Sequence, residues 1–366
     1  MTSCLFVHIL RRAQLLIFGL LLLAMAAPTL AENPAQGKTD ASTSHIALIL
    51  PLNAHTFRQP AEAVKQGFLA AANVLPDAPA VRVYPTSDEI SNILTTYQLA
   101  LSNGARVIVG PLTKNAVVAL AESDITLVPT LALSVPDTEV IRANLYLFGL
   151  SLDAETRQLA QLIAHEGRHS LLIISSTNNL GKRLQATFND EWRHLGGENT
   201  EQISFMSRTD LDALHERVAM LQPDAIFLAT NAHEARMLRP YLFETIPLYA
   251  TSLVFGGSSD AQRNLDLGGV RFLDMPWLLQ PDHPAVMAYP HPEQALGIDG
   301  ERLYAMGIDA FRLAQLFFRG EMPAGGTILD GVTGQISLGA NHQFTRELTT
   351  AEFQADVAVM VGHAKP

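Results

Sequence analysis

Two long runs of alternating strand-like and helix-like segments constrain the fold of this chain most strongly. The first run covers about 45–147 and the second about 148–250. The strand-like segments, such as Ile46–Leu50, are continuously apolar, which is typical of strands in a parallel sheet covered on both faces. Sustained strand–helix alternation predicts α/β architecture with helices on both sides of each sheet. We therefore expect two doubly wound lobes with parallel sheets.

The segments beyond residue 250 predict how these lobes are completed. They comprise a strand within 270–279, a Pro-rich stretch from Pro276 to Pro292, a long helix at about 299–318 and a strand at 334–339. One helix and two strands are too little for a third domain, so we expect the chain to cross between the lobes. Lobe 1 is predicted to hold 45–147 plus 272–325, and lobe 2 to hold 148–271 plus 326–366.

The first residues have the pattern of a secretory signal. Arg11 and Arg12 precede an apolar run at 13–27, and small residues follow it. That run is about 15 residues long, shorter than the ~20 that span a bilayer. We expect a cleaved signal peptide at 1–31, with an uncleaved anchor as the alternative. Residues 32–44 have almost no large apolar side chains, which predicts a flexible linker.

Cysteine usage bears on location and anchoring. The only cysteine is Cys4, which lies ahead of the apolar run. After cleavage the protein would have no thiol, which suits an oxidising compartment. A lipoprotein needs a cysteine directly after the apolar run, and none stands there. We therefore expect a soluble, monomeric periplasmic protein without a lipid anchor.

The charge balance argues against nucleic-acid binding. The formal net charge is −11, and no lysine or arginine cluster occurs. Proteins that bind nucleic acid usually carry a basic patch that neutralises phosphates.

Catalytic motifs are missing from the sequence. There is no Gly-x-Ser-x-Gly turn for a hydrolase nucleophile, no P-loop and no dinucleotide-binding glycine pattern. His165-Glu-Gly-Arg-His169 places two histidines four residues apart, but its glycine and residue order favour a helix C-terminus over a metal site. We expect no metal, no cofactor and no enzymatic activity.

Several residues could face a ligand at the strand ends of lobe 1. Thr113 follows a predicted strand and begins a helix, and Ser134 ends the next strand at the same sheet edge. Ligands of open α/β sheets bind at such edges, near helix N-termini. The alternative is that Thr113 only caps its helix and Ser134 only starts a turn. Arg58, in the loop after the first strand, is a further candidate.

Trp277 is the fourth candidate for the ligand-binding cleft. It lies with Asp274 where the chain is expected to cross back into lobe 1. Trp277 would either form a binding platform in the cleft or anchor the hinge, with Asp274 accepting backbone N–H groups.

A set of motifs in a fixed order along the chain points to a known family. They are Gly110-Pro-Leu, the stretch Val270-Arg-Phe-Leu-Asp-Met-Pro-Trp-Leu-Leu279, Leu303-Tyr-Ala-Met-Gly-Ile-Asp-Ala310 and Leu329-Asp-Gly-Val-Thr-Gly-Gln-Ile-Ser337. This set resembles the LppC/LpoA family of activators of class A penicillin-binding proteins. The resemblance implies a periplasmic-binding-protein type I fold (Leu/Ile/Val-binding-protein-like) with three crossings between the lobes. It also implies a non-enzymatic regulator of peptidoglycan synthesis whose partner is a class A penicillin-binding protein.

A second hypothesis shares this fold. A periplasmic solute-binding protein would trap an amino acid or similar small ligand between the lobes for an ABC importer. In amino-acid-binding members of the type I superfamily, the matching loops hold the ligand carboxylate, a role that would fall to Thr113 and Ser134. Such a protein needs convergent polar groups on both lobes, whereas an activator needs only an outer surface.

Overall fold

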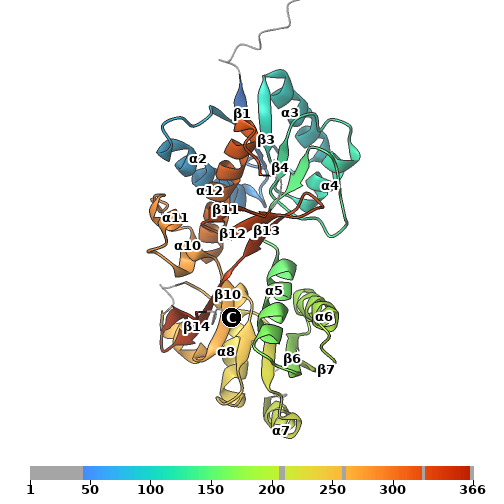
Figure 1. The fold of residues 1–366 in the computed structure, drawn as a ribbon, viewed down its shortest axis with the longest axis vertical. Helices are drawn as coiled ribbons and strands as arrows, with labels where there is room; N and C mark the ends of the chain where they lie inside the picture. The colour runs from blue at the N-terminus through green and yellow to red at the C-terminus, as the bar shows by residue number, and fades with distance from the viewer. Residues whose placement is uncertain (1–43, 206–210, 258–260, 324–325, 363–366) are drawn as a thin grey trace, which may run out of the picture. The chain divides into compact units, whose positions relative to one another are not determined.

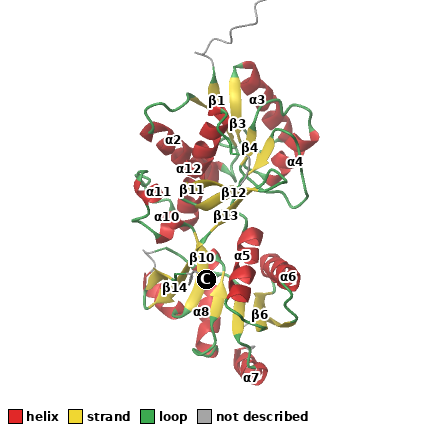
Figure 2. Ribbon diagram, viewed as in Figure 1, coloured by secondary structure: helices red, strands yellow, loops and turns green. Residues whose placement is uncertain are grey.

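Two large sheets and one small sheet organise this protein (Figures 1 and 2). The computed structural model describes residues 44–205, 211–257, 261–323 and 326–362. The predicted signal peptide at 1–31 and nearly all of the predicted linker at 32–44 lie outside the described residues. Each large sheet is covered by helices on both faces, as the alternating sequence pattern predicts.

The first large sheet contains five parallel strands in the order β2-β1-β3-β4-β5. Because neighbouring side chains of a strand point to opposite faces, Leu48 and Ile49 enter different hydrophobic clusters. The Leu48 face packs on α2 and α12, and the Ile49 face packs on α3 and α4. The elements are β1 (His45–Leu50), α2 (Arg58–Val74), β2 (Val81–Pro85), α3 (Ile90–Ser102), β3 (Ala105–Val109), α4 (Lys114–Glu122), β4 (Thr130–Ala132), β5 (Leu145–Leu147) and α12 (Gly297–Arg319).

The second large sheet has the order β15-β14-β10-β9-β8-β6-β7. Its strands from β10 to β7 are parallel, whereas β14 and β15 are added antiparallel at one edge. Helices α5 and α6 cover one face, and α7 and α8 cover the other. The elements are α5 (Leu152–His165), β6 (Ser170–Ser176), α6 (Asn179–His194), β7 (Asn199–Phe205), α7 (Leu211–Leu221), β8 (Ala225–Ala229), α8 (Ala232–Leu238), β9 (Leu248–Ala250), β10 (Val270–Asp274), β14 (Thr349–Gln354) and β15 (Val357–Met360).

A three-stranded antiparallel sheet lies between the long helix and the last strands of the chain. It consists of β11 (Thr327–Gly331), β12 (Gly334–Leu338) and β13 (Phe344–Glu347). Phe344 packs against Phe148 and Phe317, next to the first large sheet. Lobe 2 is predicted to hold 326–366; among the described residues of this segment, β14 and β15 join the second large sheet and β11 to β13 form the small one.

Short helices fill the connections within the second half of the chain. They are η3 (Arg239–Tyr241), η4 (Ser252–Val254), α9 (Ala261–Asn264), η6 (Leu265–Leu267), α10 (Pro276–Leu279) and α11 (Pro284–Met287). Among the described residues, no helix combines the length and the apolar composition that crossing a bilayer requires.

Helices α2 and α12 pack closely because glycines face backbone at their contact. A Cβ atom on Gly67 would lie 1.9 Å from the carbonyl oxygen of Tyr304, and one on Gly307 would lie 2.2 Å from that of Val64. Since real Cβ atoms do not approach backbone so closely, both positions require glycine at this separation. The long C-terminal helix is thereby attached to the first sheet.

The structure differs from the sequence-based expectations in the tail, which contains β11 and β13 to β15 besides the predicted strand at 334–339. Within the Pro-rich stretch, Pro276–Leu279 form a short helix. Proline at the first helical position is compatible with helix, because its missing N–H has no intrahelical partner there.

Candidate functional site

The junction between β10 and α10 lies within the stretch that the sequence singled out. Asp274 is the last residue of β10, where it pairs with Thr349 of β14. Its Oδ1 accepts a hydrogen bond from the backbone N–H of Met275 at 2.9 Å. Pro276 then begins α10. A buried carboxylate therefore stands at the point where the chain leaves the second sheet.

Arg302 of α12 neutralises this carboxylate. Its Nη2 donates to Asp274 Oδ2 at 2.7 Å and its Nε donates to Oδ1 at 3.3 Å. The Asp274 side chain is 2% exposed and that of Arg302 is 10% exposed. A two-point guanidinium–carboxylate contact of this kind fixes geometry as well as charge.

Arg302 also reaches two backbone carbonyls of the second lobe. Its Nη2 lies 3.0 Å from the carbonyl oxygen of Ser252 and 3.2 Å from that of Phe255. Nη1 donates to Asp299, which lies one turn earlier on the same helix. One side chain of α12 thus connects the long helix to β10 and to the loop after β9.

Glu155 of α5 completes this polar cluster. Its Oε1 accepts the backbone N–H of Ser252, and its Oε2 accepts the Ser252 hydroxyl at 3.0 Å. Burial raises the pKa of Glu155 to about 7, because desolvation and the nearby Asp274 charge outweigh the two hydrogen bonds and the attraction to Arg302.

A cavity of about 250 Å³ opens onto the same cluster. Arg346 of β13 contributes to its wall, and its Nη1 donates to the carbonyl oxygen of Thr333 at 3.3 Å. Burial lowers the pKa of Arg346, although nearby carboxylates act in the opposite direction. The polar residues that line this cavity are Ser151, Glu155, Ser252, Asp274, Asp299, Arg302 and Arg346.

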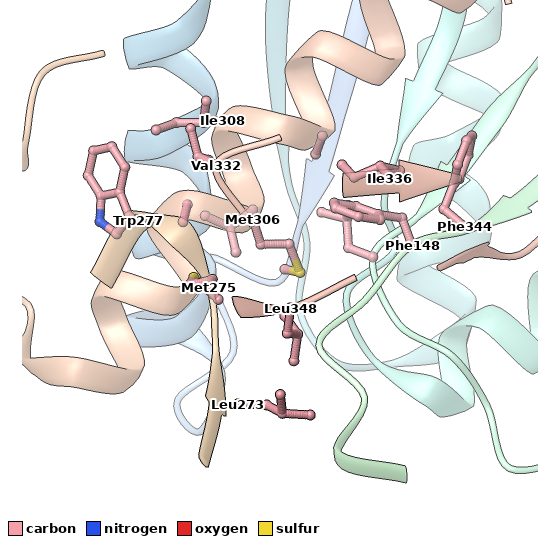
Figure 3. Packing of buried hydrophobic residues seen from close by; sticks show 14 of the residues in the cluster. Phe148, Leu273, Met275, Trp277, Met306, Ile308, Val332, Ile336, Phe344 and Leu348 are labelled. Atoms are coloured by element: carbon pink, nitrogen blue, oxygen red, sulfur yellow. The ribbon is translucent and has the colours of Figure 1, made fainter. Parts of the chain in front are cut away.

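Trp277 packs as an internal anchor in this structure. It is 3% exposed, and its indole Nε1 donates to Glu301 at 2.8 Å. Its backbone N–H donates to the carbonyl oxygen of Val332, and its ring contacts those of His291 and Tyr304. Figure 3 shows Trp277 together with other buried residues of the same hydrophobic cluster, including Ile308 of α12 and Val332. Both roles considered for Trp277, the binding platform and the hinge-side anchor, stay predictions.

Asp309 brings two of the sequence motifs together. It is fully buried in α12 and accepts hydrogen bonds from the backbone N–H groups of Val332 and Thr333 at 3.2 and 2.8 Å. The Thr333 hydroxyl and Arg312 donate to it as well. Burial raises the pKa of Asp309 even so. The Ile308-Asp309-Ala310 motif therefore holds the turn between β11 and β12.

Three of the predicted ligand-binding residues lie away from this cluster. Thr113 precedes α4, is half-buried and makes no side-chain capping bond. Ser134 is half-buried beside Gly149. Arg58 is exposed at the start of α2, where its Nε donates to the carbonyl oxygen of Leu52. None of the three lines the cavity at Asp274, so a role of these residues in ligand binding stays a prediction.

Gly110, three residues before Thr113, allows the backbone after β3 to pass close to β1. Its φ is +110°, and a Cβ atom there would lie 2.1 Å from the carbonyl oxygen of Ile49. Its N–H donates to Leu131, and the carbonyl of Pro111 accepts from Leu133. The Gly110-Pro-Leu motif therefore connects β3 closely to β1 and to the segment of β4.

The two histidines of the 165–169 segment lie where helix α5 ends. The helix stops at His165, and Gly167 follows with a φ of +71°. Across the described ranges, no group of three or more His, Cys, Asp or Glu residues is arranged to hold a metal ion.

Most of this chain matches a known protein family. Residues 38–356 match the family LppC, provisionally described as a lipoprotein, which is most of the 366 residues. The chain belongs to the LppC family. The resemblance inferred from the sequence motifs is therefore confirmed.

Curated relatives carry the name penicillin-binding protein activator LpoA. The relative from Photobacterium profundum is 26% identical over 360 residues, which cover 86% of this chain and 57% of the relative. The relative from Escherichia coli is 26% identical over 331 residues, which cover 77% of this chain and 47% of the relative. The chain spans about half the length of these relatives.

Solved structures confirm the predicted periplasmic-binding-protein type I fold. A protein from Chromobacterium violaceum, provisionally named a branched-chain amino acid ABC transporter, aligns with a TM-score of 0.74 and 35% identity, covering 84% of this chain and 99% of that one. The C-domain of LpoA from Haemophilus influenzae, a regulator of PBP1A, aligns with a TM-score of 0.73 and 24% identity, covering 87% and 100%.

Proposed function

We propose that this protein is a non-enzymatic activator of a class A penicillin-binding protein and acts in the bacterial cell envelope. The observation that carries the proposal is the family match over 38–356, whose curated relatives are named as such activators. The likeness extends over the α/β module itself, since 100% of the Haemophilus influenzae C-domain aligns with this chain. The module would therefore supply the surface that contacts the synthase.

The polar cluster at Asp274 supports a regulatory role over small-molecule capture. Both oxygens of Asp274 accept from Arg302, and both oxygens of Glu155 accept from Ser252. A pocket for a polar solute presents unsatisfied groups that the ligand then satisfies. Here the side chains satisfy one another, so the cluster serves to join the long helix to the second lobe.

The solute-binding alternative draws on the 35% identity to the Chromobacterium violaceum protein and on the cavity of about 250 Å³. Arg346 is the group in that cavity best suited to a ligand carboxylate. Its one hydrogen bond within the described residues goes to a backbone carbonyl. The alternative thus makes a separate prediction, namely that amino acids raise the melting temperature of the protein.

The deciding experiment measures the synthase directly. Glycan-strand synthesis and peptide cross-linking by the class A penicillin-binding protein of the same organism would be followed with increasing amounts of the purified chain. We expect a saturable rise in at least one rate. No change in either rate, together with a melting temperature that rises with amino-acid concentration, would replace the activator proposal by the solute-binding alternative.

A further inference from the structure

A second cavity is lined by Trp277 and Glu301 and shares no lining residue with the cavity at Asp274. It has a volume of about 630 Å³, within the range of pockets that bind small molecules or short peptide segments. Its wall comes from α10, α12, β15 and the segments before β10. The residues that line it are Phe255, Asn264, Trp277, Leu278, Leu279, Pro281, His291, Glu301, Asp356, Val357 and Ala358.

The charge of this cavity is acidic. Glu301 and Asp356 both line it, and the described lining residues include no lysine or arginine. Glu301 Oε2 accepts the indole N–H of Trp277, whereas no donor to its Oε1 occurs within the described residues. One carboxylate oxygen therefore stays available for a cationic group.

Asn264 provides independent evidence for a ligand, because its buried side-chain oxygen lacks a hydrogen-bond donor within the described residues. It is 1% exposed, and its Nδ2 donates to the carbonyl oxygens of Gly257 and Asp356 at 3.4 and 3.3 Å. Its Oδ1 is buried with no hydrogen-bond partner in the part of the chain that the structure describes. A buried acceptor without a donor costs free energy that an incoming N–H group would recover.

Apart from His291, the rest of the wall is apolar and continues onto the surface. Leu278, Leu279 and Pro281 line the cavity with Val357 of the edge strand β15. Val357 is 55% exposed and Met360, farther along the strand, is 45% exposed. An apolar wall ending at carboxylates is complementary to a long basic side chain, whose aliphatic stem packs while its charged head reaches the acids.

We propose that this cavity receives a lysine or arginine side chain from a protein partner, with β15 contacting the flanking residues of the partner segment. That the partner is the penicillin-binding protein rests on the function proposed above. The cavity is distinct from the cluster at Asp274, and the two share no described lining residue.

The two tryptophans of the chain provide a built-in reporter and a built-in control. Trp277 lines the cavity, whereas Trp192 is buried in α6 against Phe188. The full chain, labelled with ¹⁵N at the indoles, would be titrated with N-acetyl-Val-Arg-Val-amide and, separately, with N-acetyl-Val-Glu-Val-amide. We expect a saturable shift of the Trp277 indole signal with the arginine peptide alone, while the Trp192 signal stays in place.

Variants test the carboxylates. Asp356→Asn should weaken binding of the arginine peptide about twofold and Glu301→Gln about fivefold, which are the magnitudes of partly exposed ion pairs. Glu321→Gln, an exposed carboxylate at the far end of α12, should leave the affinity unchanged. An unmoved Trp277 signal at 10 mM peptide, or equal shifts with both peptides, would overturn the proposal.

The link to the synthase is tested separately. With Glu301→Gln and Asp356→Asn combined, the concentration of the chain needed for half-maximal stimulation of the synthase should rise at least about fivefold. Wild-type stimulation by this double variant would show that the synthase does not use the cavity. If the wild-type chain binds the arginine peptide but never stimulates the synthase, the proposed function fails while the cavity proposal stands.

Discussion

Arg302 is paired with two carboxylates that differ sharply in exposure. Asp274 is 2% exposed and Asp299 is 88% exposed. Removing one partner of a buried pair leaves an uncompensated charge, whereas removing an exposed partner costs little because water replaces it. The contact between Arg302 and Asp274 therefore contributes much more to the free energy of unfolding than the contact between Arg302 and Asp299.

This difference makes a prediction for two isosteric variants. Asp274→Asn should lower the free energy of unfolding by about 3 kcal/mol. Asp299→Asn should change it by no more than about 0.5 kcal/mol. Urea unfolding followed by circular dichroism measures both. Equal losses for the two variants would contradict the assigned role of Asp274.

Glu155 predicts how stability depends on pH. Its pKa is about 7 in the folded protein and near 4.5 when unfolded. Between these values the folded protein retains a proton that the unfolded chain releases, so this group lowers the free energy of unfolding as pH rises through the window. Glu155→Gln cannot titrate. It should therefore gain stability relative to wild type from pH 4.5 to pH 7.5, by up to about 3 kcal/mol.

Unfolding at several pH values tests this expectation. A constant difference between wild type and Glu155→Gln would mean that the carboxylate titrates alike in both states. If the free energy of unfolding of Glu155→Gln fell relative to that of wild type as pH rises, the sign would be opposite to the prediction and would contradict the burial argument.

Part of the site could be predicted from the sequence. Asp274 and Trp277 stood out because a buried strand seldom contains a carboxylate and Pro-Trp seldom follows it so closely, and the structure places both where β10 leads into α10. Arg302 and Glu155 were missed, since each belongs to a helix whose pattern explains it without a partner. Their meeting depends on tertiary packing between segments about 150 residues apart, for which a single sequence carries no signal.

At the scale of elements, the crossing of α2 and α12 depends on glycine. Alanine is about 1 kcal/mol better than glycine inside a helix. At Gly307 this gain is outweighed, because the added Cβ would lie 2.2 Å from the carbonyl oxygen of Val64. Moving the two helices apart would loosen the cluster that joins the first sheet to α12.

Gly307→Ala should therefore lower the free energy of unfolding by about 2 kcal/mol, in the range of overpacked cores. Gly362→Ala is the control, since a Cβ there meets no atom within 4 Å. Thermal and urea unfolding of both variants check the expectation. A Gly307→Ala protein as stable as wild type would show that the helices can separate freely.

The parallel strands were predictable, whereas of the late antiparallel strands β11 to β15 only β12 was. Strand β8 is continuously apolar, β1 is apolar after His45, and both are buried at every position. Strands β13 and β15 are short and largely exposed: β13 has one buried position and β15 has none. These strands form because the strands beside them offer free backbone hydrogen-bonding groups. Their own residue pattern does not distinguish them from an irregular C-terminal segment.

At the scale of the whole molecule, the chain contains one α/β module of the LppC family. This chain spans about half the length of its curated relatives, and the proposed activity is argued from the surface of this module. Its net charge of −11 and its acidic cavity beside β15 favour a partner surface with basic side chains. The cluster at Asp274 would then serve to keep the module in one arrangement.

Sedimentation of the purified chain with the class A penicillin-binding protein of the same organism tests whether the two proteins bind each other. We expect the chain alone to sediment as a monomer and a faster 1:1 complex to appear at micromolar concentrations, declining as salt is raised. A chain that sediments at its own rate at every ratio and concentration, beside an active synthase, would contradict this expectation.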